Sequence, residues 1–144
     1  MIYKPENFQL FEVLPKEFYN QNIQQYKDKL WLMFDYELLY ILHNLRKIYG
    51  PITLNDWYWN GKNQYRGWRS FDCSTGAFIS QHKFGRAFDC KFKNITTDEV
   101  REDIIKNYHI KAVYALISCI ELNTTWLHFD TRAWNSEELI LITP

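Results

Sequence analysis

The chain has 144 residues, the size of a single domain, and 47% of them are hydrophobic, so it can bury a core and is not disordered. Its 17 basic residues balance its 17 acidic residues. A chain without a basic excess is a poor candidate for sequence-independent binding to nucleic acid. The three cysteines, which lack a Cys-x-x-Cys spacing, predict reduced structural thiols and a reducing cytoplasm: Cys73, Cys90 and Cys119.

The N-terminal segment carries no basic region followed by an apolar region, so we expect no secretory signal. No apolar run approaches eighteen residues, so we expect no membrane span and no membrane partner. Residues 1–34 resemble an irregular, aromatic-rich arm, in which Pro15 interrupts any regular element. We expect this arm to pack on the body, residues 35–144, through Leu10, Phe11, Val13 and Leu14.

The first clear helix is expected from Asp35 to Tyr49, because its apolar residues recur at intervals of three and four. Gly50 and Pro51 end it, as a C-terminal glycine followed by proline does. The expected apolar stripe consists of Leu38, Ile41, Leu42, Leu45, Ile48 and Tyr49.

A second helix is expected after Thr96, because Thr96 and Glu99 have the spacing of a capping box. Val100, Ile104 and Ile105 supply its buried side. Strands are expected over residues 52–57, 86–92, 113–122, 124–130 and 139–142, with a tight turn near Asn123. Strands joined by short links favour an α+β fold, an antiparallel sheet with flanking helices.

Two of the four histidines have unusual neighbours. Side chains alternate along a strand, so Asp89 and His128 each lie opposite an all-apolar face and point away from the main core. If their strands are neighbours, the two Cβ atoms lie about 5 Å apart. His82 belongs to the loop before the first of these strands, and Gly85 allows that loop to fold back closely.

Two imidazoles and one carboxylate are a recognised ligand set for catalytic zinc, in which the fourth position stays open for water. Zinc in such a site is a Lewis acid that lowers the pKa of the bound water to about 7. The alternative is that both histidines are satisfied within the fold and that the aspartate lies at the surface.

Two spaced motifs stand in the region of these residues: Ser80-x-His82-x-x-Gly85-x-Ala87-x-Asp89 and, further along, Trp126-x-His128. They resemble the motifs of the zinc D-alanyl-D-alanine carboxypeptidase and L-alanyl-D-glutamate endopeptidase family. These enzymes cut peptides of bacterial cell walls, and their fold is shared with the Hedgehog signalling domain. The likeness extends from about residue 35 to the end, and the chain is most similar to small bacteriophage versions, which are endolysins or virion proteins.

By this resemblance, His82, Asp89 and His128 are the ligands of a Zn²⁺ ion. The resemblance also implies that Ser80 supports the first ligand loop by hydrogen bonding, and that Gly85 is small to allow close packing.

The family also needs a carboxylate as general base, often three residues before the last histidine ligand. Thr125 occupies that position here and cannot act as a base. Glu121, on the preceding strand, is the expected general base, although it can also be an ordinary solvated glutamate. Asp130 is the reserve candidate, and its alternatives are to orient His128 or to pair with Arg132.

Arg69, followed by Ser70, resembles the Arg-Ser segment of the family, in which an arginine holds the substrate carboxylate or polarises its carbonyl. The alternative for Arg69 is a surface salt bridge. Several tryptophans are candidates for the walls of the cleft, although core packing explains them equally well: Trp57, Trp59, Trp68 and Trp126.

The resemblance implies a zinc metallopeptidase that cleaves peptidoglycan stem peptides and is made in the cytoplasm of an infected host. It would act at the cell wall or reside in a virion, where other virion proteins are candidate partners. The alternative is a non-catalytic virion component or wall-binding module that keeps the fold. Thr125 and the aromatic N-terminal arm favour this alternative.

Overall fold

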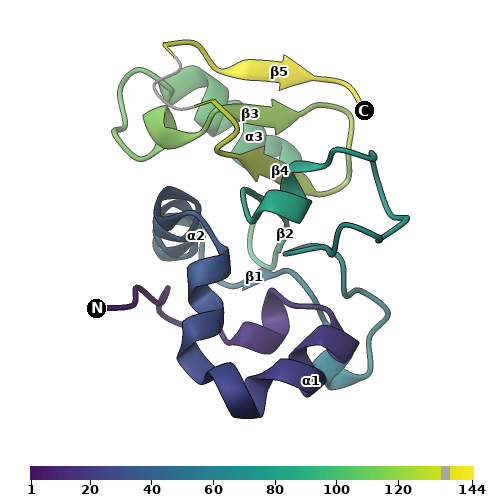
Figure 1. The fold of residues 1–144 in the computed structure, drawn as a ribbon. Coiled ribbons are helices and arrows are strands. Elements are labelled where there is room, and N and C mark those ends of the chain that lie inside the picture. The colour runs from purple at the N-terminus through teal and green to yellow at the C-terminus, as the bar shows by residue number, and fades with distance from the viewer. Residues whose placement is uncertain (134–136) are drawn as a thin grey trace.

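The computed structural model describes residues 1–133 and 137–144. In these described residues, three α-helices pack with one five-stranded sheet (Figure 1), which confirms the α+β class. The strand order across the sheet is β1-β2-β4-β3-β5. The elements are α1 (Lys16–Tyr26), α2 (Tyr36–Tyr49), β1 (Ile52–Thr53), β2 (Ala87–Phe92), α3 (Thr97–Asn107), β3 (Cys119–Glu121), β4 (Leu127–Asp130) and β5 (Ile140–Ile142).

Helix α2 confirms the predicted helix almost residue for residue. The helix ends at Tyr49, and Gly50 caps it. The φ angle of Gly50 is 83°, a value that glycine adopts readily because it has no side chain. The buried side of α2 differs from the expected stripe, because Ile48 is 44% exposed and Leu39, which was not expected there, is buried. The side chains of the stripe that are fully buried are Leu38, Ile41, Leu42 and Leu45.

Helix α3 begins with the predicted capping box. The Thr96 hydroxyl accepts a hydrogen bond from the Glu99 amide at 3.2 Å, and the Glu99 carboxylate accepts one from the Thr96 amide at 3.0 Å. Val100 and Ile104 are buried as predicted, but Ile105 is exposed, so its assignment to the buried side is wrong.

The first thirty-four residues are largely helical, which corrects the expectation of an irregular arm. Pro15 is the N-cap of α1. Proline is tolerated there because the first residues of a helix have no backbone partner for an amide hydrogen, which proline lacks. Val13 and Leu14 are fully buried, and they belong to the same core as Trp31 and Phe34. This segment packs below the sheet and α2 in the view of Figure 1.

The sheet is antiparallel except at one edge. Strand β4 pairs with β2 on one side and with β3 on the other, both antiparallel. Because both edges of β4 are occupied, β5 pairs with the free edge of β3, and it does so in parallel, with Ile120 opposite Leu141. The expectation of a wholly antiparallel sheet is corrected at this edge.

Three predicted strands are clearly shorter than expected, and the stretch 124–130 forms a strand only at β4. The stretch 113–122 forms a strand only at β3, because Tyr114–Leu116 is a 3-10 helix that buries Tyr114. The stretch 52–57 forms only β1 before a 3-10 helix over Trp57–Trp59. The turn at Asn123 is confirmed, and its φ is 60°.

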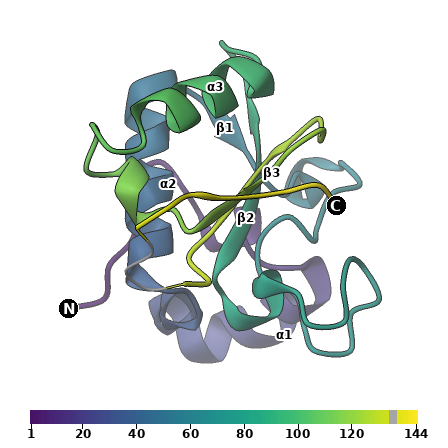
Figure 2. The ribbon, with the colours of Figure 1, turned by 90° about the horizontal axis from the view of Figure 1, so that it is seen from above.

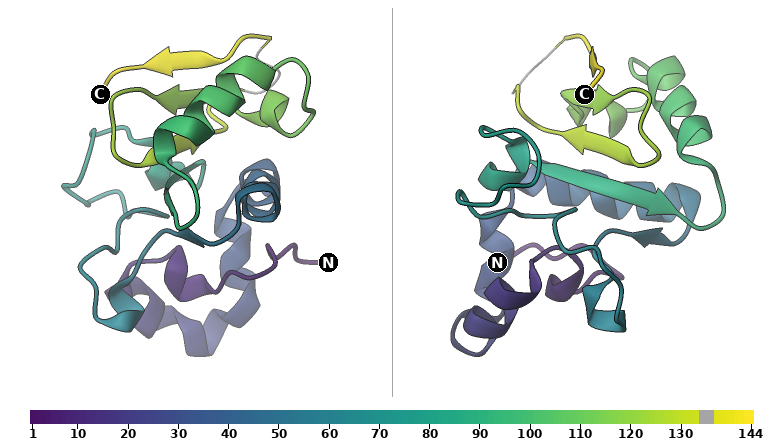
Figure 3. Two further views of the ribbon diagram at one scale, coloured as in Figure 1. Left: turned by 180° about the vertical axis from the view of Figure 1, so that it is seen from behind. Right: turned by 90° about the vertical axis from the view of Figure 1, so that its right-hand side faces the viewer.

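The two faces of the sheet have different coverings. Helices α2 and α3 lie on one side, and the long segment between β1 and β2 lies on the other (Figures 2 and 3). Phe88, Ile120 and Phe129 are fully buried within the core on the helical side. Side chains that alternate with these three therefore face the long segment. Within the described residues, no helix has the length and apolar character needed to cross a bilayer.

Candidate metal centre

Three polar residues form a row across three adjacent strands. Asp89 of β2 lies directly opposite His128 of β4, which confirms that the two come from neighbouring strands. Ile120 pairs with Phe129, so the same register, carried one residue further, places Glu121 opposite His128. Because Ile120 and Phe129 face the core, this row faces the long segment between β1 and β2.

The other histidine of the motifs, His82, reaches this row from a tight loop. His82 lies in the 3-10 helix Gln81–Phe84, and its amide donates to the Ser80 hydroxyl at 3.3 Å. Gly85 ends this helix with a φ of 68°, and a Cβ there would lie 1.9 Å from the Met33 carbonyl oxygen. Only glycine therefore allows the loop to approach the body this closely.

The ligand atoms of these residues converge. Asp89 Oδ1 lies 3.2 Å from His82 Nε2 and 2.9 Å from His128 Nδ1, and one such atom from each residue lies within 4.8 Å of the others. The exposed fractions are 2% for His82, 7% for Asp89 and 5% for His128. This buried group can hold a metal ion.

The outer nitrogen of each imidazole is bonded to an acceptor. His82 Nδ1 lies 2.7 Å from the Gly67 carbonyl oxygen, and a carbonyl can only accept. His128 Nε2 lies 3.0 Å from Asp130 Oδ2. With protons on these outer nitrogens, the inner nitrogens face Asp89 Oδ1, and either a proton or a metal ion between them makes the contact favourable. The donor set therefore fits a metal ion.

The surroundings shift the pKa values of two of these residues. Burial by itself raises the pKa of Asp89. The nearby His82 and the hydrogen bond with His128 lower this pKa by more than burial raises it, so it lies below its ordinary range. Burial by itself lowers the pKa of His128, but hydrogen bonds with Asp130 and Asp89 raise it to about 9. Asp89 is therefore ionised at neutral pH, and His128 carries a proton there that a bound metal ion would replace.

Asp130 lies behind His128 and is fully buried. Arg132 Nε lies 3.0 and 2.9 Å from the two Asp130 oxygens, so the carboxylate is fixed by Arg132 on one side and contacts His128 on the other. Both predicted alternatives for Asp130 are confirmed, orientation of His128 and pairing with Arg132. Its reserve role as a general base has no support, since Asp130 does not line the cavity described next.

A cavity of about 590 Å³ opens onto the ligand atoms. Glu121 lines it, with Oε1 3.9 Å from His128 Nδ1, so its carboxylate stands beside the ligands. Thr125 does not line this cavity: its side chain is exposed, and its carbonyl accepts from Lys91 Nζ at 2.6 Å. Position 121 on β3, and not position 125, therefore places its side chain beside the ligand atoms.

Arg69 is buried behind Asp89. Its guanidinium lies 3.1 Å from Asp89 Oδ2, donates to the Tyr65 carbonyl at 2.6 Å and reaches the Thr75 carbonyl at 3.4 Å. The pairing is thus buried, and the alternative of a surface salt bridge is wrong. Arg69 holds Asp89 in place through this pairing. Because Arg69 also lines the cavity, its predicted contact with a substrate remains a prediction.

Trp126 alone among the candidate tryptophans lines this cavity. Its Nε1 is buried and has no hydrogen-bond partner within residues 1–133 and 137–144. Trp57 donates to the Leu14 carbonyl, Trp59 is 57% exposed, and Trp68 lines a different groove. A buried donor without a partner is costly unless a ligand or water accepts from it.

Arg101 of α3 is a buried residue that sequence reasoning missed. Its guanidinium donates to the carbonyls of Glu121 at 2.9 Å, Thr124 at 3.1 Å and Trp126 at 3.1 Å. It therefore fixes the turn between β3 and β4, and the cavity-wall residues Glu121 and Trp126 lie at the two ends of this turn. No sequence signal marks it, because a charged residue on an amphipathic helix is usually solvated.

A scan against protein-family models and searches of curated proteins and of solved structures each found no match. The geometry of the site is therefore the basis for assigning a function.

Proposed function

We propose that this chain is a zinc-dependent peptidase that cleaves the stem peptides of bacterial peptidoglycan. The observation that carries the proposal is the convergence of His82 Nε2, Asp89 Oδ1 and His128 Nδ1 in a cavity that also holds Glu121. Structural zinc is usually closed by four protein ligands, whereas three ligands beside a cavity are typical of catalytic zinc. The resemblance of the ligand motifs to Hedgehog-like cell-wall peptidases supports the choice of substrate.

Zinc, when bound, supplies a Lewis acid that acidifies water in the open position. Glu121 takes a proton from the attacking water and returns it to the leaving amine. Trp126 Nε1 donates a hydrogen bond to the peptide carbonyl, which satisfies this unpaired donor. Arg69 and Asp130 hold Asp89 and His128 from outside, so the ligand atoms keep their positions.

The first test is elemental analysis of zinc in the protein and in two variants. We expect one zinc per chain in the native protein and none in Asp89→Ala, because that variant removes the ligand between the two imidazoles. Glu102→Ala, which removes an exposed carboxylate from α3, is the matched control and should keep its zinc.

The same three proteins are then incubated with purified peptidoglycan, and newly exposed amino groups are measured. Release by the native protein and by Glu102→Ala, but not by Asp89→Ala, supports the peptidase. A chain that takes up no zinc, even after reconstitution, contradicts the proposal. Full zinc loading without any release of amino groups also contradicts it, and favours the non-catalytic wall-binding or virion component.

A further inference from the structure

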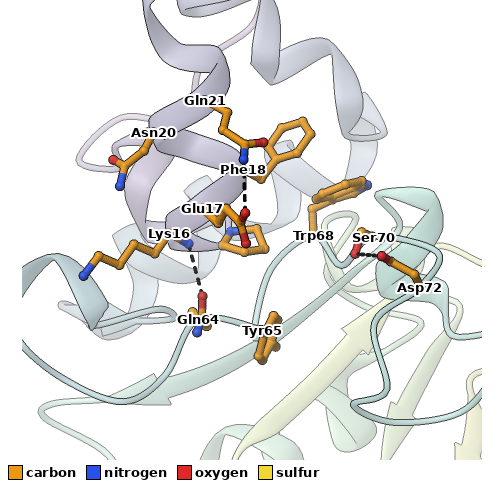
Figure 4. Close-up of a pocket in the computed structure, with 11 residues that line it drawn as sticks. Lys16, Glu17, Phe18, Asn20, Gln21, Gln64, Tyr65, Trp68, Ser70 and Asp72 are labelled. Carbon is orange, nitrogen blue, oxygen red and sulfur yellow. Dashed lines mark hydrogen bonds between the residues drawn. The ribbon is translucent and has the colours of Figure 1, made fainter.

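A second hollow, a groove of about 760 Å³, lies between α1 and the segment of residues 64–72. Figure 4 shows side chains from both walls pointing into it. It is separate from the metal cavity, and the peptidase chemistry proposed above does not use it.

Aromatic rings form much of its surface. Phe18 of α1 packs against Trp68 across the groove, with ring centroids 4.5 Å apart and planes tilted by 47°. Tyr65 is 37% exposed and has no ring partner in the part of the chain that the structure describes. Flat, partly exposed rings are surfaces on which an apolar face of a ligand can stack.

Polar groups surround these rings. Gln21 Nε2 donates to Glu17 Oε1 at 3.1 Å, and Gln64 Oε1 accepts from the Lys16 amide at 3.2 Å (Figure 4). Each bond engages one end of an amide and leaves the other end, Gln21 Oε1 or Gln64 Nε2, without a bond to the described residues. The groove therefore offers an acceptor and a donor, and a ligand that suits both carries groups that donate and accept.

The charges of the groove exclude an anionic ligand. Among the described residues that line it, Lys16 is the one basic residue, whereas Glu17 and Asp72 are both acidic. Phosphate groups and nucleic acids are bound by clusters of cations, which this groove lacks. A neutral ligand with flat apolar faces and many hydroxyl or amide groups fits better, and a chain of N-acetylated sugars has both features.

The groove and the metal cavity are neighbours, because a third cavity of about 270 Å³ has lining residues in common with each of them. It shares Gln64 and Tyr65 with the groove, and Arg69, Asp89 and Trp126 with the metal cavity. A branched ligand can therefore occupy the metal centre with one arm and the groove with another.

We propose that this groove is a saccharide subsite, which holds the N-acetylated glycan strand from which a stem peptide extends to the metal centre. The choice of wall glycan rests on the proposed function, because that substrate joins sugars to peptides. Sugar binding itself needs neither the metal nor Glu121.

The test is calorimetric titration with a soluble tetramer of N-acetylglucosamine. We expect saturable binding that weakens at least about ten-fold in Trp68→Leu, which keeps an apolar contact with Phe18 but loses the flat ring. Gln21→Ala, a change on the surface of α1, should weaken binding several-fold without affecting the fold. The matched control is Trp59→Leu, which removes an exposed ring outside the groove and should bind like the native protein.

Asp89→Ala distinguishes failure of this subsite from failure of the proposed peptidase. If Asp89→Ala binds the tetramer normally and no protein digests peptidoglycan, the subsite stands and the peptidase falls. If the native protein digests peptidoglycan but does not bind the tetramer saturably, the subsite falls and the peptidase stands. Binding that is unchanged in both Trp68→Leu and Gln21→Ala also overturns the subsite.

Discussion

The position of the general base depends on the direction in which single side chains point. Trp126 and His128 both line the metal cavity, whereas Thr125, beside Trp126, points away from it. A carboxylate at position 125 would therefore face away from the ligand atoms in this fold. Glu121 lies across the strand pair from His128 and brings a carboxylate to the same place from β3.

Replacing the Glu121 carboxylate tests its role directly. We expect Glu121→Gln to keep its zinc, since Glu121 is outside the ligand group, and to lower the turnover of peptidoglycan by about 10²–10⁴-fold. The amide has a similar shape but cannot take a proton. Zinc content and the rate of amino-group release are the measurements.

Thr125→Ala is the control for this experiment, because it changes the position at which the peptidase family often carries its acid. We expect activity within about two-fold of the native rate, since Thr125 does not touch the cavity. Retained turnover in Glu121→Gln, or a large loss in Thr125→Ala, would remove Glu121 from the proposed role.

Helix α3 acts on the site as an element, through one buried side chain. Arg101 links this helix to the backbone of the turn between β3 and β4, and it pairs with Asp98 at 2.5 Å within the helix. The carbonyl of Glu121 is one of the acceptors. Arg101 is therefore a positioning residue for Glu121, and it does not line the metal cavity.

We expect Arg101→Met to lower the free energy of unfolding by about 2–4 kcal/mol, because it leaves several buried carbonyls without a donor. The variant should keep its zinc and lose kcat more than it raises KM, as expected when a general base is displaced. Urea unfolding, zinc analysis and kinetics on peptidoglycan measure these effects.

Lys106→Met changes an exposed cation on the same helix and should match the native protein in all three measurements. If Arg101→Met is less stable but keeps its full kcat, Arg101 holds the fold without positioning Glu121.

Elements with strong local signals were the ones that could be predicted. Helix α2 has a clear apolar stripe and a glycine stop, and α3 has its capping box, so both follow from short stretches of sequence. Helix α1 has no fully buried side chain, so its apolar pattern is weak, and the sequence did not reveal it. Residues 113–117 resemble a strand, but Tyr114 instead bonds with Asp103 on α3.

The same distinction applies to the site. His82, Asp89 and His128 were predicted from a local motif and from strand alternation, and the structure brings their ligand atoms together. The contacts of Gly67 with His82 and of Arg101 with the β3–β4 turn depend on how distant segments pack. Such contacts leave no periodic trace in one sequence, so only the three-dimensional structure shows them.

At the scale of the whole molecule, one carboxylate joins three segments of the helical side. Asp103 of α3 accepts hydrogen bonds from Tyr49 at the end of α2, from Tyr114 at 2.5 Å and from Lys111 at 3.1 Å. Burial raises the pKa of Asp103, but these hydrogen bonds lower it by more, so the pKa is about 2. The carboxylate is therefore ionised in the folded protein at any ordinary pH.

Because the folded pKa of about 2 lies below the ordinary value of 3.8, ionised Asp103 stabilises the fold above about pH 4, and this contribution fades towards pH 2. We expect Asp103→Asn to lower the free energy of unfolding by about 1–2 kcal/mol at neutral pH, since the carboxylate is partly exposed. The difference from the native protein should shrink below about pH 4 in urea unfolding. Glu102→Gln, the control, should show no such difference. If Asp103→Asn loses the same free energy of unfolding at every pH, the charge of Asp103 does not stabilise these contacts.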